Sequence, residues 1–300
     1  MALIISISFM YYLNDILDTQ RVLYIPKGSI NAIISNLEKR EINVTKLDTY
    51  VLRLIGKPQS GWIDMQEKRL KRGDFLYKLT TSKAAMTKIR LIPGETTYIF
   101  LRQLAKKYNY NIEKLEYYYN KYTPIKEGAL VPETYYLPLG LNEQQTIRLL
   151  LQLSKTQMKK WSIKIFGVFD EKKWFDYITL ASIIQKEAAS NEEMPQVSSV
   201  IYNRLKKGMK LQMDGTLNYG KYSHIKITPR RLREDKSSYN TYLNAGIPPY
   251  PVCNVSLSAI KAAIKPAKSD YLYFMKAKNG THNFTRYYST HIKNIKNATK

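Results

Sequence analysis

Two stretches of the chain share one order of predicted elements, and this repetition constrains the fold more than any other feature. Residues 21–47 show a short apolar strand, a turn with proline and glycine, an amphipathic helix and a second short helical segment. Residues 90–115 run through the same order. Short strands alternating with helices of period 3.6 predict an α+β chain, and the self-similarity predicts an internal duplication.

The second copy resembles the LysM module, a small glycan-binding fold. The similarity lies in its Pro-Gly-Glu-Thr start at residues 93–96 and in its helix end at residues 104–108. We therefore predict a LysM-like βα region over residues 18–161, with a generic βα unit as the alternative. Within this region we also expect a hairpin over residues 70–79 and a long helix from residue 143 to about residue 161.

The chemistry of the chain is indicated by a helix whose apolar face ends in an acid. Leu180, Ile183, Ile184 and Glu187 follow the i, i+3, i+4, i+7 spacing of one helix face, and Asp176 is the predicted N-cap. Burying an ionised carboxylate is costly, and the usual response is a raised pKa. A carboxyl that stays protonated near neutral pH can act as a general acid. The alternative is that Glu187 lies past the buried part and meets water.

Clusters of hydrogen-bonding side chains follow this helix. A second amphipathic helix is predicted to end near Gly208, and residues 211–220 are predicted to form a strand and a turn. Amide, hydroxyl and tyrosine side chains on short loops can hold sugar hydroxyls, although each cluster alone is ordinary turn chemistry. The predicted substrate-binding residues are Asn203, Gln212, Asp214, Thr216, Tyr239, Asn240, Tyr242 and His282.

With these segments in this order and spacing, the chain resembles the endolytic murein (peptidoglycan) transglycosylases of the MltG or YceG-like family. The matching segments are residues 180–187, 203–205, 211–216, 239–242, 246–249, 271–274 and 280–284, with residues 127–135 upstream. The resemblance implies that a YceG-like catalytic domain of mixed helix and strand, residues 162–300, follows the LysM-like region.

The resemblance also implies an activity. The chain would cut nascent peptidoglycan strands internally, between N-acetylmuramic acid and N-acetylglucosamine, and leave a 1,6-anhydro end without adding water. Glu187 matches the catalytic glutamate of the family. A glycoside hydrolase usually needs two carboxylates, whereas this reaction can use one, because the C6 hydroxyl of the sugar is the nucleophile. Glu187 would serve as acid and then as base, and Asp214 would have a structural or substrate-binding role.

Three positions depart from the family pattern. Gly215 stands where a proline is usual, which predicts a looser turn. Gln185 replaces a glutamate, and residues 255–256 replace a Pro-Gly turn. We expect none of these changes to touch Glu187. The three histidines and the single cysteine, Cys253, are too scattered to predict a metal site, and the reaction requires no cofactor.

The formal net charge of +24 favours anionic partners. The predicted partners are peptidoglycan glycan strands, an anionic membrane surface and, by resemblance, penicillin-binding proteins of wall synthesis. A nucleic-acid binder is the charge-based rival, since residues 201–233 hold nine basic residues and one acid. No nucleic acid is expected, because no recognition motif is present. The other rival is a non-catalytic scaffold that binds the cell wall.

The first 13 residues carry no charge, although a membrane span needs about 20 apolar residues. We predict that residues 1–17 are the remnant of a membrane anchor whose true start is missing. This places the chain at the bacterial inner membrane by a single-pass anchor, with the catalytic domain on the periplasmic side. The alternative is a strand or short helix that packs on the first domain.

Overall fold

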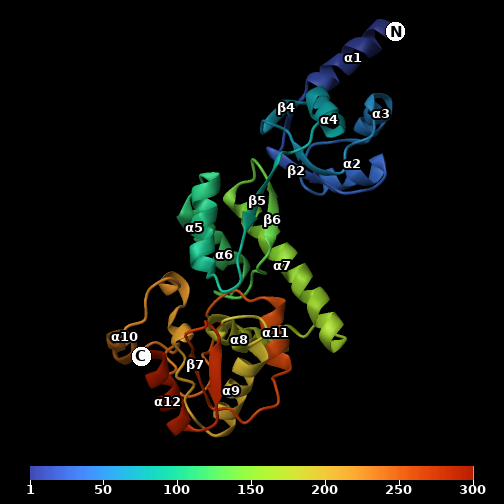
Figure 1. Cartoon of the computed structure of the whole chain (residues 1–300). Helices are drawn as coiled ribbons and strands as arrows, with labels where there is room; N and C mark the ends of the chain where they lie inside the picture. Colours follow the sequence, from blue (N-terminus) through green and yellow to red (C-terminus); the bar gives the residue numbers. More distant parts are fainter. Residues whose placement is uncertain (300) are drawn as a thin grey trace. The chain divides into compact units, whose positions relative to one another are not determined.

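The computed structural model describes residues 1–299 and divides the chain into two compact units (Figure 1). The N-terminal unit comprises Met1–Ile89 with Tyr136–Asn142, and the C-terminal unit comprises Arg90–Tyr135 with Glu143–Lys300. The second predicted repeat therefore belongs to the same unit as Glu187. The mixture of helix and strand fits the predicted α+β class, whereas a LysM fold is not confirmed. A catalytic domain that starts at residue 162 stays a prediction.

The N-terminal unit is built from short strands and helices. Its elements are α1 (Ala2–Asn14), β1 (Ile16–Asp18), β2 (Val22–Ile25), α2 (Ile30–Glu38), α3 (Lys46–Ile55), β3 (Gly61–Asp64), β4 (Arg69–Lys71) and α4 (Arg72–Thr81). Strand β1 pairs antiparallel with β4, and β2 pairs antiparallel with β3. The predicted hairpin over residues 70–79 is wrong. Phe75, Leu76 and Leu79 are all fully buried, and their spacing places them on one face of a helix.

Helix α1 is fastened to this unit by its last turn. The Tyr12 hydroxyl donates to Asp48 Oδ1 at 2.8 Å, and the Arg72 guanidinium lies 4.4 Å from the centre of the Tyr12 ring. Arg72 is 2% exposed and binds Asp48 and Asp15 at 2.8 Å each, so this buried cation is paired.

The predicted single-pass anchor is not supported. Helix α1 has only 13 residues. Among residues 1–299, no helix combines the length and the apolar character that a membrane crossing requires. The predicted inner-membrane location depended on that anchor, so it is not supported either.

Two further strands carry the chain between the units, and the remaining elements belong to the C-terminal unit. Strands β5 (Met86–Arg90) and β6 (Thr134–Pro138) pair with each other. The other elements are α5 (Thr97–Tyr108), α6 (Ile112–Tyr122), α7 (Glu143–Phe166), α8 (Glu171–Glu187), α9 (Met194–Lys206), η1 (Asp214–Leu217), η2 (Gly220–Tyr222), α10 (Pro229–Glu234), α11 (Leu257–Ile264), β7 (Tyr273–Lys276), β8 (His282–Thr285) and α12 (Tyr288–Thr299).

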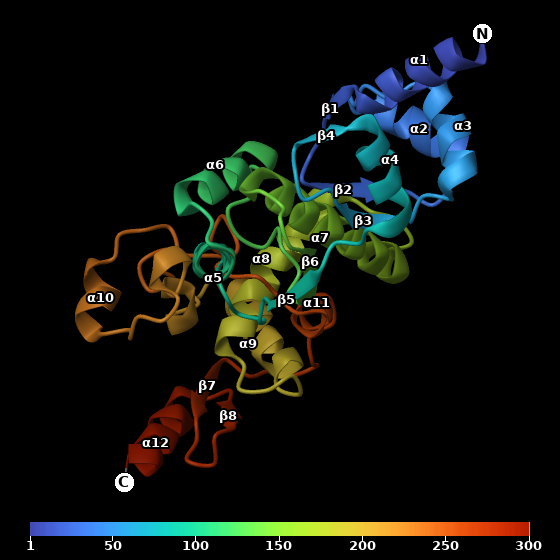
Figure 2. The same cartoon turned by 90° about the horizontal axis from the view of Figure 1, so that it is seen from above.

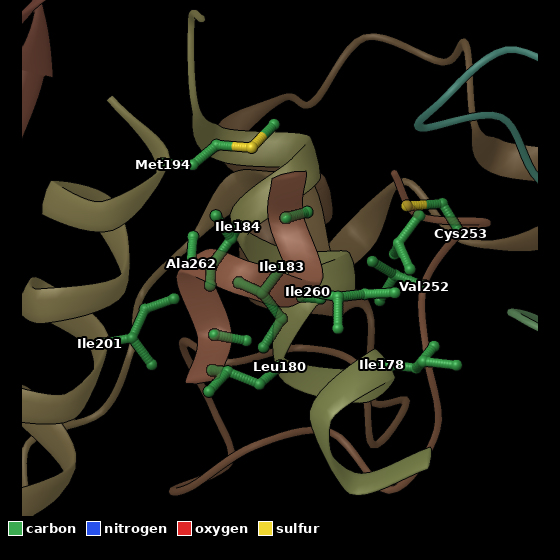
Figure 3. Close-up of a cluster of buried hydrophobic side chains, with 14 of the residues drawn as sticks. Ile178, Leu180, Ile183, Ile184, Met194, Ile201, Val252, Cys253, Ile260 and Ala262 are labelled. Atoms are coloured by element: carbon green, nitrogen blue, oxygen red, sulfur yellow. The ribbon is translucent and has the colours of Figure 1, made fainter. Parts of the chain in front are cut away.

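The core of the C-terminal unit forms where α8 packs against α11. Figure 3 shows Ile183 and Ile184 of α8 converging with Ile260 and Ala262 of α11. Helix α8 begins earlier than predicted, because Asp170, and not Asp176, is its N-cap and accepts a hydrogen bond from the Lys173 N–H at 3.1 Å. This packing fixes the axis of the helix that ends in Glu187.

A hairpin and a helix complete the C-terminal unit. Strands β7 and β8 pair antiparallel with Phe274 opposite Phe284, and α12 lies beside them (Figure 2). The ring of Tyr273 packs against those of Tyr288 and His291 from α12. These aromatic contacts attach the last helix to the hairpin.

Candidate active site

Glu187 is the last residue of α8, one turn beyond the fully buried Ile183 and Ile184. The helix stops there because Ala188 has an extended backbone, with φ at −70° and ψ at 135°. The Glu187 residue is half-buried. The alternative that it lies out in bulk water is therefore not supported, and the apolar face does deliver a carboxyl to a partly desolvated position.

The expectation that Gly215 does not touch Glu187 is wrong, because Gly215 contacts this carboxyl directly. Its N–H donates to Glu187 Oε1 at 2.7 Å. Residues 214–217 form the 3-10 turn η1, so the strand predicted over residues 211–220 is wrong. The prediction of a loose turn is also wrong, since Gly215 is buried and a Cβ there would lie 2.6 Å from Lys186 Cβ. A side chain would overlap the end of α8.

Burial raises the pKa of Glu187 to about 7. The Gly215 N–H opposes this by stabilising the carboxylate, the Asp214 charge adds to the increase, and the Arg204 charge works against it. A carboxyl with a pKa near neutrality can give up a proton and take one back at physiological pH. The sequence predicted a raised pKa for this acid, and its burial in the structure gives the same direction.

Arg204 reaches the site from α9. It is 8% exposed, its Nε donates to the Leu272 carbonyl at 2.6 Å, and a terminal nitrogen donates to the Leu211 carbonyl at 2.7 Å. These bonds tie the irregular segment before η1 and the segment before β7 to α9, and they hold a positive charge near Glu187. Arg204 lies outside the set of predicted site residues, because its burial cannot be read from the sequence.

Asp214 and Tyr242 form a pair beside Glu187. The Tyr242 hydroxyl donates to Asp214 Oδ1 at 2.6 Å. Burial and the Asp214 charge raise the pKa of the Tyr242 phenol, so the hydroxyl stays protonated and remains a donor. Asp214 is otherwise exposed, so its carboxylate is available to solvent or to a ligand.

Two of the predicted binding residues hold loops together instead of facing solvent. Thr216 is fully buried, and its hydroxyl donates to the Met213 carbonyl at 2.7 Å. Asn240 is also fully buried and donates to the carbonyls of Leu232 and Asp235 at 2.9 and 2.7 Å. Burial favours a role for both side chains in shaping the site over direct contact with a sugar.

Gln212 is exposed and lies in the short segment just before η1. Its backbone has a positive φ of 47°, a conformation that few residues other than glycine adopt readily. Its N–H donates to the Thr241 carbonyl at 3.1 Å. Gln212 lies two residues before Asp214 in the sequence.

Tyr239 belongs to an aromatic surface. Its ring stacks on Tyr219 with centroids 4.2 Å apart and an interplanar angle of 15°. Beside this stack lies a hollow of about 440 Å³, and its lining residues are Tyr219, Tyr222, Thr228, Arg230, Arg231, Glu234 and Asp235. Aromatic faces and cations therefore occur together on this part of the surface.

Two predicted residues lie in other networks. Asn203 donates to the carbonyls of Ser269 and Tyr271 at 2.9 Å each. His282 Nδ1 lies 2.7 Å from Glu193 Oε2, and the His282 N–H donates to the other oxygen of that carboxylate at 2.8 Å. In the described part of the chain, neither side chain hydrogen-bonds to Glu187. Their substrate-binding roles stay predictions.

A buried acid that was not among the predicted site residues organises the segment that follows η1. Glu95 is 4% exposed and accepts from the Ser223 hydroxyl at 3.1 Å, while its second oxygen lies 2.9 Å from His224 Nε2. The neighbouring Thr96 hydroxyl donates to the Gly220 carbonyl at 2.9 Å. Ser223 in turn accepts from Lys186 Nζ at 3.0 Å. The Pro-Gly-Glu-Thr turn at residues 93–96 was predicted only as the start of a module. It is connected through Ser223 to Lys186, the residue before Glu187.

A second buried acid lies in the same unit. Glu127 is 6% exposed, accepts from the Thr97 N–H at 2.8 Å, and has its pKa raised to about 8 by burial. Such a group stays protonated at neutral pH and acts as a structural hydrogen-bonding group.

Comparisons with known proteins agree on one family. The model of the YceG-like family matches residues 23–297. The chain is 30% identical to an endolytic murein transglycosylase of Bacillus subtilis over 90% of this chain and 82% of that protein. It is 32% identical to a protein of the same name from Streptococcus pneumoniae over 68% of this chain and 36% of that protein. A crystal structure of a yceG-like protein from Listeria monocytogenes matches with a TM-score of 0.59 and 26% identity, covering 92% of this chain and 99% of that one.

Proposed function

The chain belongs to the YceG-like family, and from this membership we propose that it is an endolytic murein transglycosylase. It cuts peptidoglycan glycan strands between N-acetylmuramic acid and N-acetylglucosamine and leaves 1,6-anhydro ends. The observation that carries this proposal is Glu187, a half-buried carboxyl at a helix end whose pKa is raised to about 7. The name that its relatives share supports the substrate class.

The first step uses Glu187 as an acid. The protonated carboxyl gives its proton to the glycosidic oxygen, the bond from that oxygen to the sugar C1 breaks, and the electron pair leaves with the oxygen. A carboxyl with an ordinary pKa would be ionised at neutral pH and could not do this. The raised pKa leaves about half of the Glu187 carboxyls protonated at pH 7.

The second step uses the same group as a base. The C6 hydroxyl of the same sugar attacks C1, and its proton passes to the Glu187 carboxylate. Because the nucleophile is already attached to the sugar, no water has to be positioned and no second carboxylate is needed. The proton returns to Glu187, so that one side chain serves both steps and is ready for the next turnover.

The groups around Glu187 divide into those that face a substrate and those that support the site. We assign direct contact with sugar hydroxyls to the exposed Asp214, its partner Tyr242 and Gln212. The Tyr239–Tyr219 stack offers an aromatic surface of the kind on which sugar rings pack. Thr216 and Asn240 hold the loops in place. The net charge of +24 favours approach to the acidic peptide stems of the wall.

The test uses the full chain and uncrosslinked glycan strands, with products identified by mass spectrometry. The wild-type chain should release fragments with 1,6-anhydro ends, and Glu187→Gln should release none. Glu192→Gln is the matched control, because Glu192 is an exposed acid close in sequence, and it should keep wild-type activity. Equal release by the wild-type chain and Glu187→Gln would reject Glu187 as the catalyst. Binding without release by the wild-type chain would favour the non-catalytic wall-binding scaffold.

A further inference from the structure

Gly215 is a glycine because of space and not because of backbone conformation. Its φ lies outside the left-handed region that glycine alone tolerates well. A Cβ at this position would lie 2.6 Å from Lys186 Cβ and 2.8 Å from Glu187 Oε1. The missing side chain therefore allows the backbone of η1 to approach the carboxyl of Glu187 directly.

Because of this close approach, the two carboxyl oxygens of Glu187 have different surroundings. Oε1 accepts the Gly215 N–H at 2.7 Å. Oε2 makes no hydrogen bond with any residue of the described chain. In a protonated carboxyl the carbonyl oxygen accepts hydrogen bonds while the other oxygen carries the proton. An oxygen that already faces an N–H is the acceptor, which leaves the proton to Oε2.

We infer that the Gly215 N–H is a positioning group for catalysis, which fixes Glu187 Oε1 as the acceptor oxygen and Oε2 as the oxygen that transfers the proton. This inference rests on the proposed function. In the first step the proton leaves Oε2 for the glycosidic oxygen as the C1–O bond breaks. In the second step Oε2 takes the proton of the attacking C6 hydroxyl. The N–H stays on Oε1 throughout and stabilises the carboxylate that exists between the two steps.

The charged and titratable groups that act on Glu187 come from three segments. Asp214 at the start of η1 favours its protonated form, while Arg204 from α9 favours the carboxylate. The Tyr242 phenol also lies close enough to interact electrostatically with Glu187 and is neutral. The Lys186 ammonium is held by Ser223. Unlike these side chains, the Gly215 N–H hydrogen-bonds to the carboxyl, so it distinguishes between the two oxygens.

The decisive experiment removes the N–H without adding an atom. Replacing Gly215 with glycolic acid changes the backbone amide to an ester and leaves no Cβ to overlap Lys186. The same change at Gly208, whose N–H donates to the Leu205 carbonyl at 3.1 Å, is the matched control. Rates and pH profiles of anhydro-end release are compared for the wild-type chain and the two esters.

The expected result has two parts. The Gly215 ester should lose at least about tenfold in kcat with KM little changed, because the proton is no longer directed to one oxygen. Its high-pH limb should move upward by about one pH unit, because a carboxylate that loses a donor takes up a proton more readily. The Gly208 ester should match the wild-type chain. A purely structural role for Gly215 would lower the active fraction without moving the limb.

Gly215→Ala is a second variant with a separate readout. Its Cβ should displace the carboxyl, and ¹³C titration of the Glu187 carboxyl should then show a higher pKa than in the wild-type chain. An unchanged limb and kcat in the ester would overturn the inference, even where Glu187→Gln is inactive. If Glu187→Gln remains active, the proposed role of Glu187 as the catalyst fails instead, and the ¹³C titration still reports whether Gly215 binds the carboxyl.

Discussion

Glu187→Gln is expected to stabilise the chain while it abolishes cleavage, and the gain in stability should grow with pH. Burial raises the pKa of Glu187 from 4.5 to about 7 in the folded chain. The folded state therefore binds this proton more tightly than the unfolded state. The stability that this tighter proton binding gives the folded state is fully present below the unfolded pKa, and it is lost as pH rises through the folded pKa.

The size of the effect follows from the two pKa values. At about 1.4 kcal/mol per pH unit, the titration of Glu187 lowers the free energy of unfolding by about 1 kcal/mol at pH 5 and by about 3 kcal/mol at pH 8. Glutamine does not titrate, and its Oε1 can still accept the Gly215 N–H. The stability of Glu187→Gln relative to the wild-type chain should therefore rise by about 2–3 kcal/mol between pH 5 and pH 8.

The assay is urea unfolding of both chains at the two pH values, with calorimetry to assign the transition of the C-terminal unit. Glu192→Gln is the control, because Glu192 is exposed and its pKa is lowered by the Ser190 hydroxyl, so its removal should bring no such gain. A stability difference that stays flat or shrinks from pH 5 to pH 8 would refute the claim that Glu187 is a buried acid held near neutrality.

Three further outcomes are expected. Release of anhydro ends should fall about tenfold for each pH unit above the Glu187 pKa of about 7, because the first step needs the protonated acid; a flat profile from pH 7 to pH 9 would contradict this. Asn254→Ala should cost about 2–4 kcal/mol in urea unfolding, because the buried Asn254 amide bonds three separate groups; a loss below about 0.5 kcal/mol would contradict that account. Gly128→Ala should destabilise by about 1–3 kcal/mol, because φ is +83° and a Cβ would lie 2.8 Å from Ile178; an unchanged melting temperature would argue against it.

The sequence predicted the position of Glu187 because the evidence for it is local. Apolar residues at helical spacing specify which face of α8 is buried, and the acid follows one turn later on that face. The order of strand, helix and helix in each repeat was predictable for the same reason, as β2, α2 and α3 show. Hydrophobic periodicity predicts only the local secondary structure and the buried face of a segment, over about ten residues.

The partners of Glu187 could not be predicted in this way. Gly215 is 28 residues further along the chain, and Glu95 is 128 residues from Ser223, which it binds. Nothing in either local pattern indicates that the segments meet. The hairpin expected over residues 70–79 failed for a related reason: β4 finds its partner in β1, more than 50 residues earlier, and the chain after β4 is free to form a helix.

The two repeats show how similar local chemistry can serve different tertiary roles. Ser29 caps α2 and Thr96 caps α5, each by accepting an N–H from three residues later. Ser29 is exposed, whereas Thr96 is fully buried and also donates to the Gly220 carbonyl. Both oxygens of the adjacent Glu95 are occupied as well. The turn that makes the second repeat resemble a glycan-binding module is therefore committed inside the C-terminal unit, where it holds the loop next to Lys186, and any glycan contact by this turn would first have to break those bonds.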